Sequence, residues 1–421
     1  MKEESGPIGQ LGLFDETHII GAGISGLLMG YYLKKNGHSV KIFEKQSHIG
    51  GKIRTIKGDL GFAETAANAV FTNEDAIDLF QELKISPVKS TVKLKRLLQR
   101  TSTLKSFPFL VWEIPFIILS LFKRLPKDMD KISIYEFFKP LLGKRASYEV
   151  LSSVFGGIYA TDAKTLSFRS VFKQKFNSVT YFGFIRELIK QRKARRHKPE
   201  SVSFSGGMSD LIQALREKLK DNIVCDTNAS IQSNVNTIIC TDAHDASKVV
   251  GELLPKISEE LLKISYSPVI STTMILKTPV SKLEGAFGAL FSPVSPVKCA
   301  GILNNSAIFP ERTVDPNKRS YTFIHLGESY SEQDAFQDLK KIEPSTDWQK
   351  SLEEKFVTNW QRGIPLYDQQ RSESIKKIRS LFHGRPKGIV LFGNYVDGIS
   401  IREMISMAKE FASKSPKVIS S

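Results

Sequence analysis

The sequence predicts an α/β and α+β fold, in which a Rossmann-like dinucleotide-binding domain is joined to a mixed-sheet domain and a helical subdomain. Three observations predict it. A glycine fingerprint follows a short apolar strand near the N-terminus, strand-like runs separated by Pro and Gly occupy 267–326, and a basic, apolar, helix-rich stretch covers 86–199. A chain of 421 residues can bury more than one core, so two or three domains are expected.

The glycine fingerprint belongs to a predicted strand–turn–helix unit. An apolar strand ends at Ile20, and the glycines after it allow a tight turn, close approach to a diphosphate, and close packing of the next helix. The N-terminus of that helix directs free N–H groups at phosphates. The second strand, 39–43, ends before a carboxylate that suits the two ribose hydroxyls. The candidate contacts in this unit are Gly21, Ala22, Gly23, Ile24, Ser25, Gly26, Glu44 and Lys45.

The next segment indicates which dinucleotide is bound. The run "HIGGKIRT" (48–55) resembles the GG-[RK]-x-x-[ST] segment that follows the second strand in FAD enzymes of the amine oxidase and phytoene desaturase superfamily. Gly50 and Gly51 allow the backbone to approach the cofactor, and Lys52 or Arg54 can neutralise its diphosphate. Nicotinamide dehydrogenases do not usually carry this second glycine pair, so FAD is the expected cofactor.

The composition limits which cellular compartment and which partners are expected. Cys225, Cys240 and Cys299 lie far apart with no CxxC and no His cluster, which indicates a reducing compartment and neither a metal nor a disulfide framework. The first 17 residues include acids and no apolar core, unlike a signal peptide. The net charge of +16 has one concentration, at 190–198, but no nucleic-acid-binding motif accompanies it, so no nucleic-acid partner is expected.

One segment indicates contact with a membrane surface. The run "FPFLVWEIPFIILSLFKRL" (107–125) is intensely apolar and ends in basic residues, but two prolines and Glu113 interrupt it, and it is too short to span a bilayer. It is either a buried core helix or a segment lying in the membrane interface. We favour peripheral or monotopic attachment to the cytoplasmic side of a membrane, with a plain cytoplasmic location as the alternative.

Several further motifs resemble those of the protoporphyrinogen oxidase family, and they are scattered over most of the chain. The segments that carry this resemblance are "FGGIYATDAKTLSFRSVF" (155–172), "FSGGMSDL" (204–211), "GAFGALFSP…AGILNNSAIFPER" (285–312), "NWQRGIPLY" (359–367) and "LFGNYVDGISI" (391–401). The first and last motifs of the chain are shared by the whole superfamily, whereas the middle ones are more specific to this family.

The resemblance implies FAD-dependent oxidation of protoporphyrinogen IX to protoporphyrin IX in haem biosynthesis. Hydride passes to flavin N5 and oxygen is the expected final acceptor, so no catalytic side chain is required. Three alternatives stay open: oxidation of coproporphyrinogen III to coproporphyrin III, another FAD-dependent desaturase or amine oxidase reaction, and a non-catalytic flavin-binding tetrapyrrole carrier. A homodimer is also left open.

The resemblance also implies site residues and a domain plan. The implied flavin contacts near the C-terminus, where a helix begins, are Gly393, Asn394, Gly398, Ile399 and Ser400. The implied substrate contacts are Arg96, Gly157, Ile158, Tyr159, Ala160 and Asn304. Arg96 would pair with a propionate of the substrate. Asn304 stands where the family has an aromatic residue. The expected units are an FAD-binding domain (15–75, 201–260 and 375–415), a helical membrane-binding subdomain (86–199) and a substrate-binding domain (76–85 and 261–374).

Overall fold

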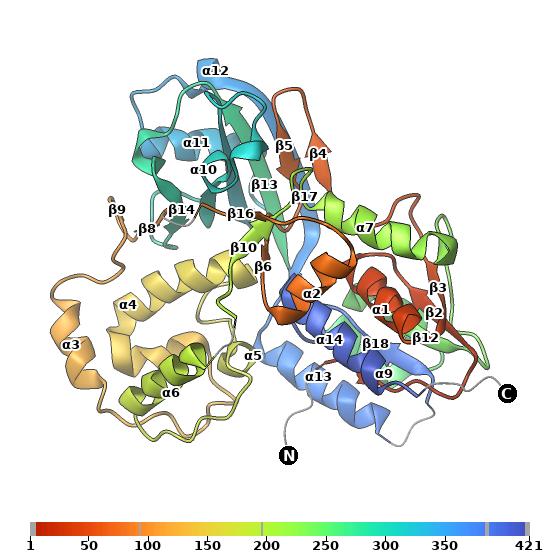
Figure 1. Ribbon diagram of the computed structural model, residues 1–421. Helices are drawn as coiled ribbons and strands as arrows, with labels where there is room; N and C mark the ends of the chain where they lie inside the picture. Colours follow the sequence, from red (N-terminus) through yellow and green to blue (C-terminus); the bar gives the residue numbers. More distant parts are fainter. Residues whose placement is uncertain (1–5, 92–93, 195–196, 384–386, 417–421) are drawn as a thin grey trace.

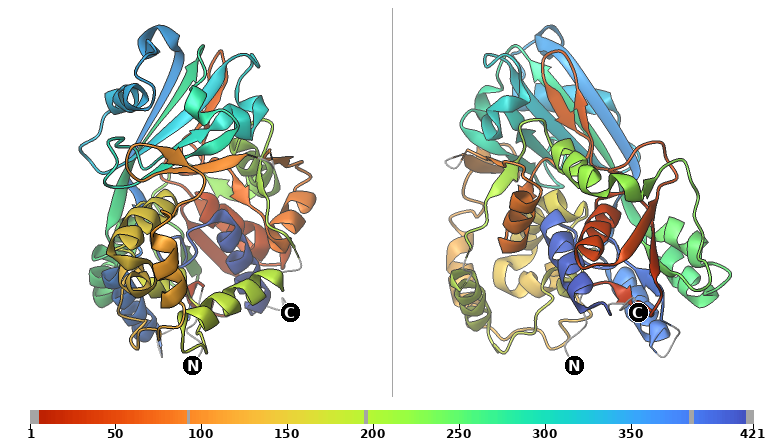
Figure 2. Two further views of the ribbon diagram at one scale, coloured as in Figure 1. Left: turned by 90° about the vertical axis from the view of Figure 1, so that its left-hand side faces the viewer. Right: turned by 45° about the vertical axis from the view of Figure 1, so that its right-hand side comes forward.

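The computed structural model describes residues 6–91, 94–194, 197–383 and 387–416. It has three parts, which Figure 1 shows side by side: a nucleotide-binding domain at the lower right, a mixed sheet at the top, and a helical part at the lower left. In both views of Figure 2, the helical part lies below the mixed sheet.

The nucleotide-binding domain is built on a six-stranded sheet. Its strand order is β1 (Ile8–Gly9), β18 (Ile389–Leu391), β12 (Asn236–Ile239), β2 (Glu16–Ile20), β3 (Ser39–Phe43) and β11 (Ile223–Val224). All neighbouring strands are parallel except β1, which is antiparallel to β18. Helices lie on both faces, so the central strands β12 and β2 are almost wholly buried, whereas β3 alternates exposed and buried residues.

Two separate cores flank this sheet. On one face, helices α1 (Ile24–Lys35), α7 (Ser209–Leu219) and α14 (Ile401–Lys414) share a core with α2 (Glu74–Glu82). On the other face lie α8 (Ala243–Val250), α9 (Pro255–Leu262) and α13 (Gln369–Phe382). Glycine loops therefore emerge from a rigid, doubly covered sheet, which fixes the backbone of any site at its edge.

The mixed sheet has seven strands. Their order is β17 (Leu352–Pro365), β13 (Tyr266–Leu276), β16 (Arg319–Leu326), β15 (Gly301–Asn304), β14 (Ala286–Phe291), β8 (Lys95–Gln99) and β9 (Leu104–Lys105). β8 is parallel to β14, and the other pairs are antiparallel. The core on one face also contains side chains of α11 (Glu332–Ile342) and α12 (Trp348–Ser351). The short α10 (Asn305–Ile308) directly follows β15.

The helical part comprises α3 (Glu113–Ser120), α4 (Ile134–Tyr159), α5 (Phe168–Val171) and α6 (Tyr181–Lys193). Its core is aromatic, with fully buried rings of Phe137, Phe168, Tyr181 and Phe184 packed together. α4 starts with a capping box and changes direction at Gly143, whose φ is +79°. The aromatic packing gives this part a core of its own.

Two domain limits differ from those expected from the sequence. Residues 86–199 were expected to be helical, but β8 and β9 lie in this range and extend the mixed sheet. Residues 76–85 were expected in the substrate-binding domain, but Ala76, Leu79 and Phe80 of α2 are buried in the nucleotide-binding core, because the i, i+3, i+4 spacing of these residues gives α2 an apolar face. Smaller pairings complete the fold: a three-stranded sheet of β6 (Val70–Phe71), β10 (Ser201–Ser203) and β7 (Val88–Lys89), and a pair of β4 (Thr55–Lys57) with β5 (Phe62–Glu64).

Candidate functional site

The loop between β2 and α1 has the shape of a diphosphate cradle. A Cβ added to Gly26 would lie 1.9 Å from the Gly21 carbonyl oxygen, so only glycine allows α1 to start this close to the strand. Gly23 and Gly51 face each other, and the only heavy atom within 4 Å of a Cβ added to either is the Cα of the other. Gly23 is also the N-cap of α1 and provides no side-chain cap. The first-turn N–H groups of α1 therefore border open space, where an anion can accept from them.

Glu44 is fixed beside this loop. It directly follows β3 and is 8% exposed, and its Oε2 accepts a hydrogen bond from the Ala22 N–H at 2.8 Å. Its Oε1 accepts from the Gln46 N–H at 3.0 Å. The carboxylate is thus held in place by the backbone before any ligand arrives. Lys45, by contrast, extends to Asp245 on α8, 2.5 Å away.

The two cations that could neutralise a diphosphate lie in different surroundings. Arg54 is exposed, with Nη1 3.4 Å from the His48 ring. Lys52 points to strand β17, where its Nζ donates to the carbonyl oxygens of Arg362 and Gly363, the latter at 2.7 Å. Burial lowers the pKa of Lys52 to about 8, although Asp242 opposes the shift. Lys52 therefore links the nucleotide-binding domain to the mixed sheet.

The loop between β18 and α14 presents N–H donors outward. Its carbonyl groups are held from within: the Gly393 oxygen accepts from Val396 N, the Asn394 oxygen from Tyr367 Oη at 2.5 Å, and the Tyr395 and Val396 oxygens from the Arg371 guanidinium. Within the described chain, no hydrogen bond has the N–H of residue 393, 394 or 395 as its donor. These N–H groups and the start of α14 form a donor set that fits the polar edge of a flavin ring.

Arg96 and Gly157 lie on the same side of the mixed sheet. Arg96 pairs with Gly288, and Leu98 pairs with Leu290, so these residues project from one face. The added Cβ of Gly157, at the end of α4, would lie 3.1 Å from Leu290. The face on which Arg96 lies is therefore the one that α4 approaches. Arg96 is exposed on it.

This side of the sheet includes residues that the sequence motifs did not identify. The Arg96 guanidinium lies 5.2 Å from the centroid of the Phe287 ring, in the irregular part of β14. Leu290 packs between Gly157 and Gly301, since a Cβ added to either glycine would lie 3.1–3.2 Å from it. The alternation of side chains along 286–291 could have predicted which of them share a face. Which of them lie beside Arg96 depends on the register between β14 and β8, which the sequence does not give.

The end of α4 lies close to the loop between β18 and α14, which is called the C-terminal loop below. Ile158 is 52% exposed, whereas Ala160 is buried and caps the helix with a φ of +52°. The ring of Tyr159 lies 5.3 Å from the ring of Tyr367, whose hydroxyl holds the loop. Burial raises the pKa of Tyr159 to about 12, so this hydroxyl is neutral at physiological pH. The predicted substrate residues of α4 thus lie next to the predicted flavin residues.

Asn304 does not join this group, which corrects its predicted role as a substrate contact. It is 3% exposed, and its Nδ2 donates to the Leu283 carbonyl oxygen at 3.0 Å. Leu303, its neighbour in β15, pairs with Gly288 and shares the face of Arg96. Because successive side chains in a strand alternate, Asn304 projects from the opposite face, into the core beneath α11.

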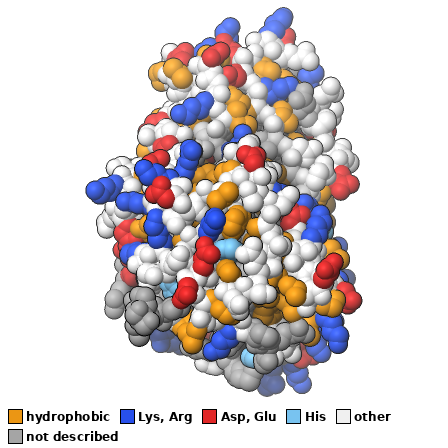
Figure 3. Space-filling view, turned by 90° about the vertical axis from the view of Figure 1, so that its right-hand side faces the viewer, with side chains coloured by type: hydrophobic (Ala, Val, Ile, Leu, Met, Phe, Trp, Pro, Cys, Tyr) orange, Lys and Arg blue, Asp and Glu red, His pale blue; other side chains and the backbone are white. Residues whose placement is uncertain are grey.

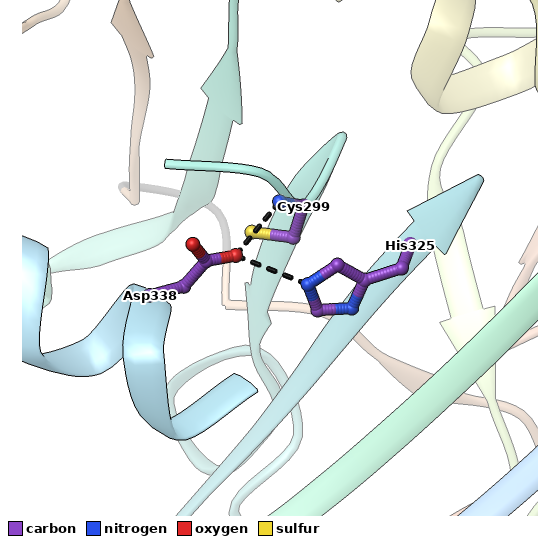
Figure 4. A group of neighbouring side chains, drawn as sticks. All are labelled: Cys299, His325 and Asp338. Carbon is purple, nitrogen blue, oxygen red and sulfur yellow. Dashed lines mark hydrogen bonds and ion pairs between the residues drawn. The ribbon is translucent and has the colours of Figure 1, made fainter. Parts of the chain in front are cut away.

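A second polar cluster lies in that core. Cys299, His325 and Asp338 are all buried, with one possible ligand atom from each within 4.8 Å of the others (Figure 4). The Asp338 carboxylate already accepts from the N–H groups of Lys298 and Cys299, each at 2.8 Å, and from His325 Nε2 at 3.0 Å. These bonds occupy the oxygens that a cation would need, so the cluster braces α11 against the sheet.

Comparisons with known proteins agree with this geometry. Residues 19–83 match a family model described as an NAD(P)-binding Rossmann-like domain. The chain is 24% identical to protoporphyrinogen oxidase 2 of Arabidopsis thaliana, over 92% of this chain and 91% of the relative. It is 21% identical to coproporphyrinogen III oxidase of Bacillus subtilis, over 93% of this chain and 96% of the relative.

Solved structures share the fold. A protein from Exiguobacterium, provisionally named protoporphyrinogen oxidase, superimposes with a TM-score of 0.77 at 18% identity, covering 95% of this chain and 98% of its own. Cyclohexylamine oxidase from Brevibacterium oxydans gives a TM-score of 0.67 at 12% identity, covering 95% and 99%. The comparisons confirm the resemblance to protoporphyrinogen oxidases, the fold class, the assignment to FAD-dependent oxidoreductases, and FAD as cofactor. Among the described helices, none combines the length and apolarity needed to cross a bilayer.

Proposed function

We propose that the chain oxidises protoporphyrinogen IX to protoporphyrin IX in haem biosynthesis, with FAD as cofactor and oxygen as electron acceptor. The resemblance to named protoporphyrinogen oxidases extends over nine-tenths of the chain and supports this proposal. One observation carries the choice of substrate. Arg96, Phe287 and Leu290 place a guanidinium beside apolar side chains on one side of the mixed sheet, which suits a flat apolar macrocycle with a carboxylate at its edge.

The residues of the chain hold and orient the reactants. When bound, FAD supplies the redox chemistry itself, by accepting hydride at N5 and passing electrons to oxygen. The backbone at Gly23 and Gly51 would hold the diphosphate, and the Glu44 carboxylate would accept from the ribose hydroxyls. The loop at 393–400 would bind the flavin ring through N–H groups, with the positive end of α14 behind it.

Arg96 would orient the macrocycle. Its guanidinium can form two parallel hydrogen bonds with a propionate, while the Phe287 ring beneath restricts its orientation. Gly157 allows α4 to pack closely on Leu290, where the Cβ of a larger residue would lie 3.1 Å from that side chain. The macrocycle would lie beside this contact, on the exposed side that bears Arg96, because α4 ends next to both Leu290 and Tyr367.

Coproporphyrinogen III is a second candidate substrate, because coproporphyrinogen III oxidases also align with nearly the whole chain. It carries four carboxylates, whereas protoporphyrinogen carries two. A pocket for it needs more cations than Arg96 provides. Lys95 is adjacent to Arg96, but successive residues of a strand project from opposite faces.

The test is a direct comparison of the two porphyrinogens. The purified FAD-loaded protein is supplied with each under matched conditions, and porphyrin fluorescence and oxygen uptake are recorded. We expect a higher kcat/KM with protoporphyrinogen and three oxygen molecules consumed per porphyrin formed. A higher kcat/KM with coproporphyrinogen would favour the second candidate. Failure to oxidise either substrate while FAD is retained would contradict both.

We also propose that the helical part attaches to an anionic membrane surface. Its exposed apolar side chains gather on and beside α3, where Val111, Trp112, Leu119 and Phe122 are 71–80% exposed. Phe122 stacks on Phe182 of α6, which extends this apolar surface to a second helix. Single exposed apolar residues are ordinary, but a group of this size indicates an interaction surface.

The distribution of charge supports the same proposal. Residues 105–198 contain 19 Lys and Arg against seven Asp and Glu, a net charge of +12, whereas the whole chain carries +16. On the opposite side of the molecule, basic and acidic side chains are interspersed (Figure 3). A basic segment beside exposed aromatic and aliphatic side chains favours binding to anionic lipid.

A further inference from the structure

Arg371 is a buried cation directly beneath the C-terminal loop. It lies in the first turn of α13 and is 5% exposed. Its Nε donates to the Tyr395 carbonyl oxygen and its Nη2 to the Val396 carbonyl oxygen, each at 2.8 Å. Its guanidinium carbon lies 3.9 Å from the centroid of the Tyr367 ring. The guanidinium therefore contacts the loop itself and Tyr367, whose hydroxyl also bonds to the loop.

Stability alone does not account for a cation at this position. The N-terminal end of a helix is its positive end, so an arginine in the first turn is unfavourable there. Burial of a charge is costly unless a partner neutralises it. In the described parts of the chain, no carboxylate lies within ion-pair distance of this guanidinium. Asp397 of the loop pairs with Lys173, and Arg371 acts on it only at longer range. Positions that break such rules are often functional.

The contacts of Arg371 decide which way the loop presents its peptide groups. Together with the Tyr367 hydroxyl, they hold three consecutive carbonyl oxygens, those of residues 394–396, toward the protein. The N–H of a trans peptide points opposite to its C=O, so the N–H groups of 395 to 397 are oriented by the same contacts. The N–H groups of Val396 and Asp397 bond to Gly393. The Tyr395 N–H donates no hydrogen bond within the described residues and points away from Tyr367, because the Asn394 C=O accepts from Tyr367.

We infer that Arg371 is a positioning residue for the cofactor, because it holds the flavin-binding loop in shape and places one buried positive charge beneath it. The inference rests on the proposed function in one respect, that this loop binds FAD. Reduction adds negative charge to the bound ring, so a fixed cation nearby stabilises the reduced cofactor more than the oxidised one. Arg371 thus raises the midpoint potential of the enzyme as well as its affinity for FAD.

Two substitutions separate the effect of the Arg371 charge from the effect of its hydrogen-bonding geometry. Arg371→Gln removes the charge, and Arg371→Lys keeps the charge but cannot reach both carbonyls with a planar fork. The measurements are the FAD dissociation constant, the midpoint potential from reductive titration against a reference dye, and the melting temperature. Arg100→Gln is the matched control, since Arg100 is equally buried but pairs with Glu113 and Glu149 in the helical part.

In Arg371→Gln, we expect the preference for reduced over oxidised FAD to fall about tenfold, a drop of about 30 mV for a two-electron couple. Arg371→Lys should keep the wild-type potential but bind FAD about tenfold more weakly. Arg100→Gln should lower the melting temperature and change neither quantity. Wild-type potential and FAD affinity in Arg371→Gln, with only a lower melting temperature, would overturn the inference.

If Arg371→Gln does not fold, the variants Arg371→Lys and Tyr367→Phe test the inference in its place. Tyr367→Phe keeps the ring against the guanidinium but loses the bond to the Asn394 oxygen. Weaker FAD binding in both variants supports the inference, and wild-type FAD affinity in both overturns it. None of these measurements uses a porphyrinogen. If the wild-type protein bound no FAD, the proposed function would fail, and that result would be distinct from a failure at Arg371.

Discussion

Arg312 and Glu64 form an ion pair buried where the mixed sheet meets the nucleotide-binding domain, with 2% and 1% of their side chains exposed. Arg312 also donates to the Asn68 carbonyl oxygen at 2.7 Å and to Ser203 Oγ at 2.9 Å. Glu64 accepts in addition from the Met208 N–H at 2.9 Å. Three segments that are distant in the sequence, 64–68, 203–208 and Arg312, are therefore joined at one point, and the two domains are held in a fixed relation there.

Breaking this pair should destabilise the protein strongly. Arg312→Leu leaves the Glu64 carboxylate buried without its cation, which costs about 3–5 kcal/mol. The double variant Arg312→Leu/Glu64→Gln should recover part of this loss, because no charge is left unpaired. Denaturant unfolding measures both. Lys414→Ala, which removes an exposed pair with Glu410, is the control and should cost less than about 1 kcal/mol. A double variant as unstable as the single one would contradict the explanation.

Loss of the Glu44 carboxylate should weaken FAD binding without unfolding the domain. Glu44→Ala removes charge-assisted hydrogen bonds to the ribose, worth about 1.5–3 kcal/mol, so the FAD dissociation constant should rise at least about tenfold. Fluorescence titration of the apoprotein with FAD measures it. Glu16→Ala is a matched control, because Glu16 lies at the exposed start of β2. Equal FAD affinity in both variants would show that Glu44 does not bind the ribose.

Lys52 should make FAD binding depend on pH. Burial lowers its pKa to about 8, so the free protein loses this proton as pH rises above 8, while below pH 8 the lysine is charged. A bound diphosphate favours the charged form, so binding above pH 8 requires uptake of a proton, and affinity should fall by up to about tenfold per pH unit. Isothermal titration between pH 7 and 10 tests this. In Lys52→Met the pH dependence should disappear; if it persists, another group is responsible.

Arg96 should affect substrate binding more than cofactor binding. Arg96→Ala removes one charge-assisted contact with a propionate, so KM should rise about tenfold with little change in kcat or in FAD affinity. Lys95→Ala changes a neighbouring exposed cation on β8 and should leave KM within about twofold. Steady-state kinetics with protoporphyrinogen distinguishes the two. An unchanged KM in Arg96→Ala would remove this residue from the substrate site.

The apolar surface on α3 should control binding to lipid vesicles. Replacing Trp112, Leu119 and Phe122 with Ser removes side chains that are 71–75% exposed, so folding should be retained while apolar contact with lipid is lost. Sedimentation with vesicles of mixed neutral and anionic lipid is the measurement, with circular dichroism to confirm folding. Leu13→Ser, at an exposed leucine of the nucleotide-binding domain, is the control. Equal sedimentation of all variants would contradict attachment through α3.

The parts of the site that depend on local spacing could be predicted from the sequence. The glycine loop, Glu44 at the end of a strand, and the helix that starts after Gly398 are each set by residues close together in the chain. Contacts between distant segments could not be predicted. Lys52 bonds to carbonyls 310 and 311 residues away. The side on which Asn304 projects depends on the register of β15, since a shift of one residue reverses it.

The position of strand β18 in the sheet affects how the protein folds during its synthesis. It lies in the nucleotide-binding sheet between β1 and β12, yet it is formed by residues 389–391. The sheet begun by residues 8–43 therefore stays incomplete until residues 389–391 have left the ribosome. Pairing over such sequence separations slows folding and exposes unpaired strand edges meanwhile. Truncation before residue 389 should leave a nascent chain that needs chaperone protection and cannot yet acquire its cofactor.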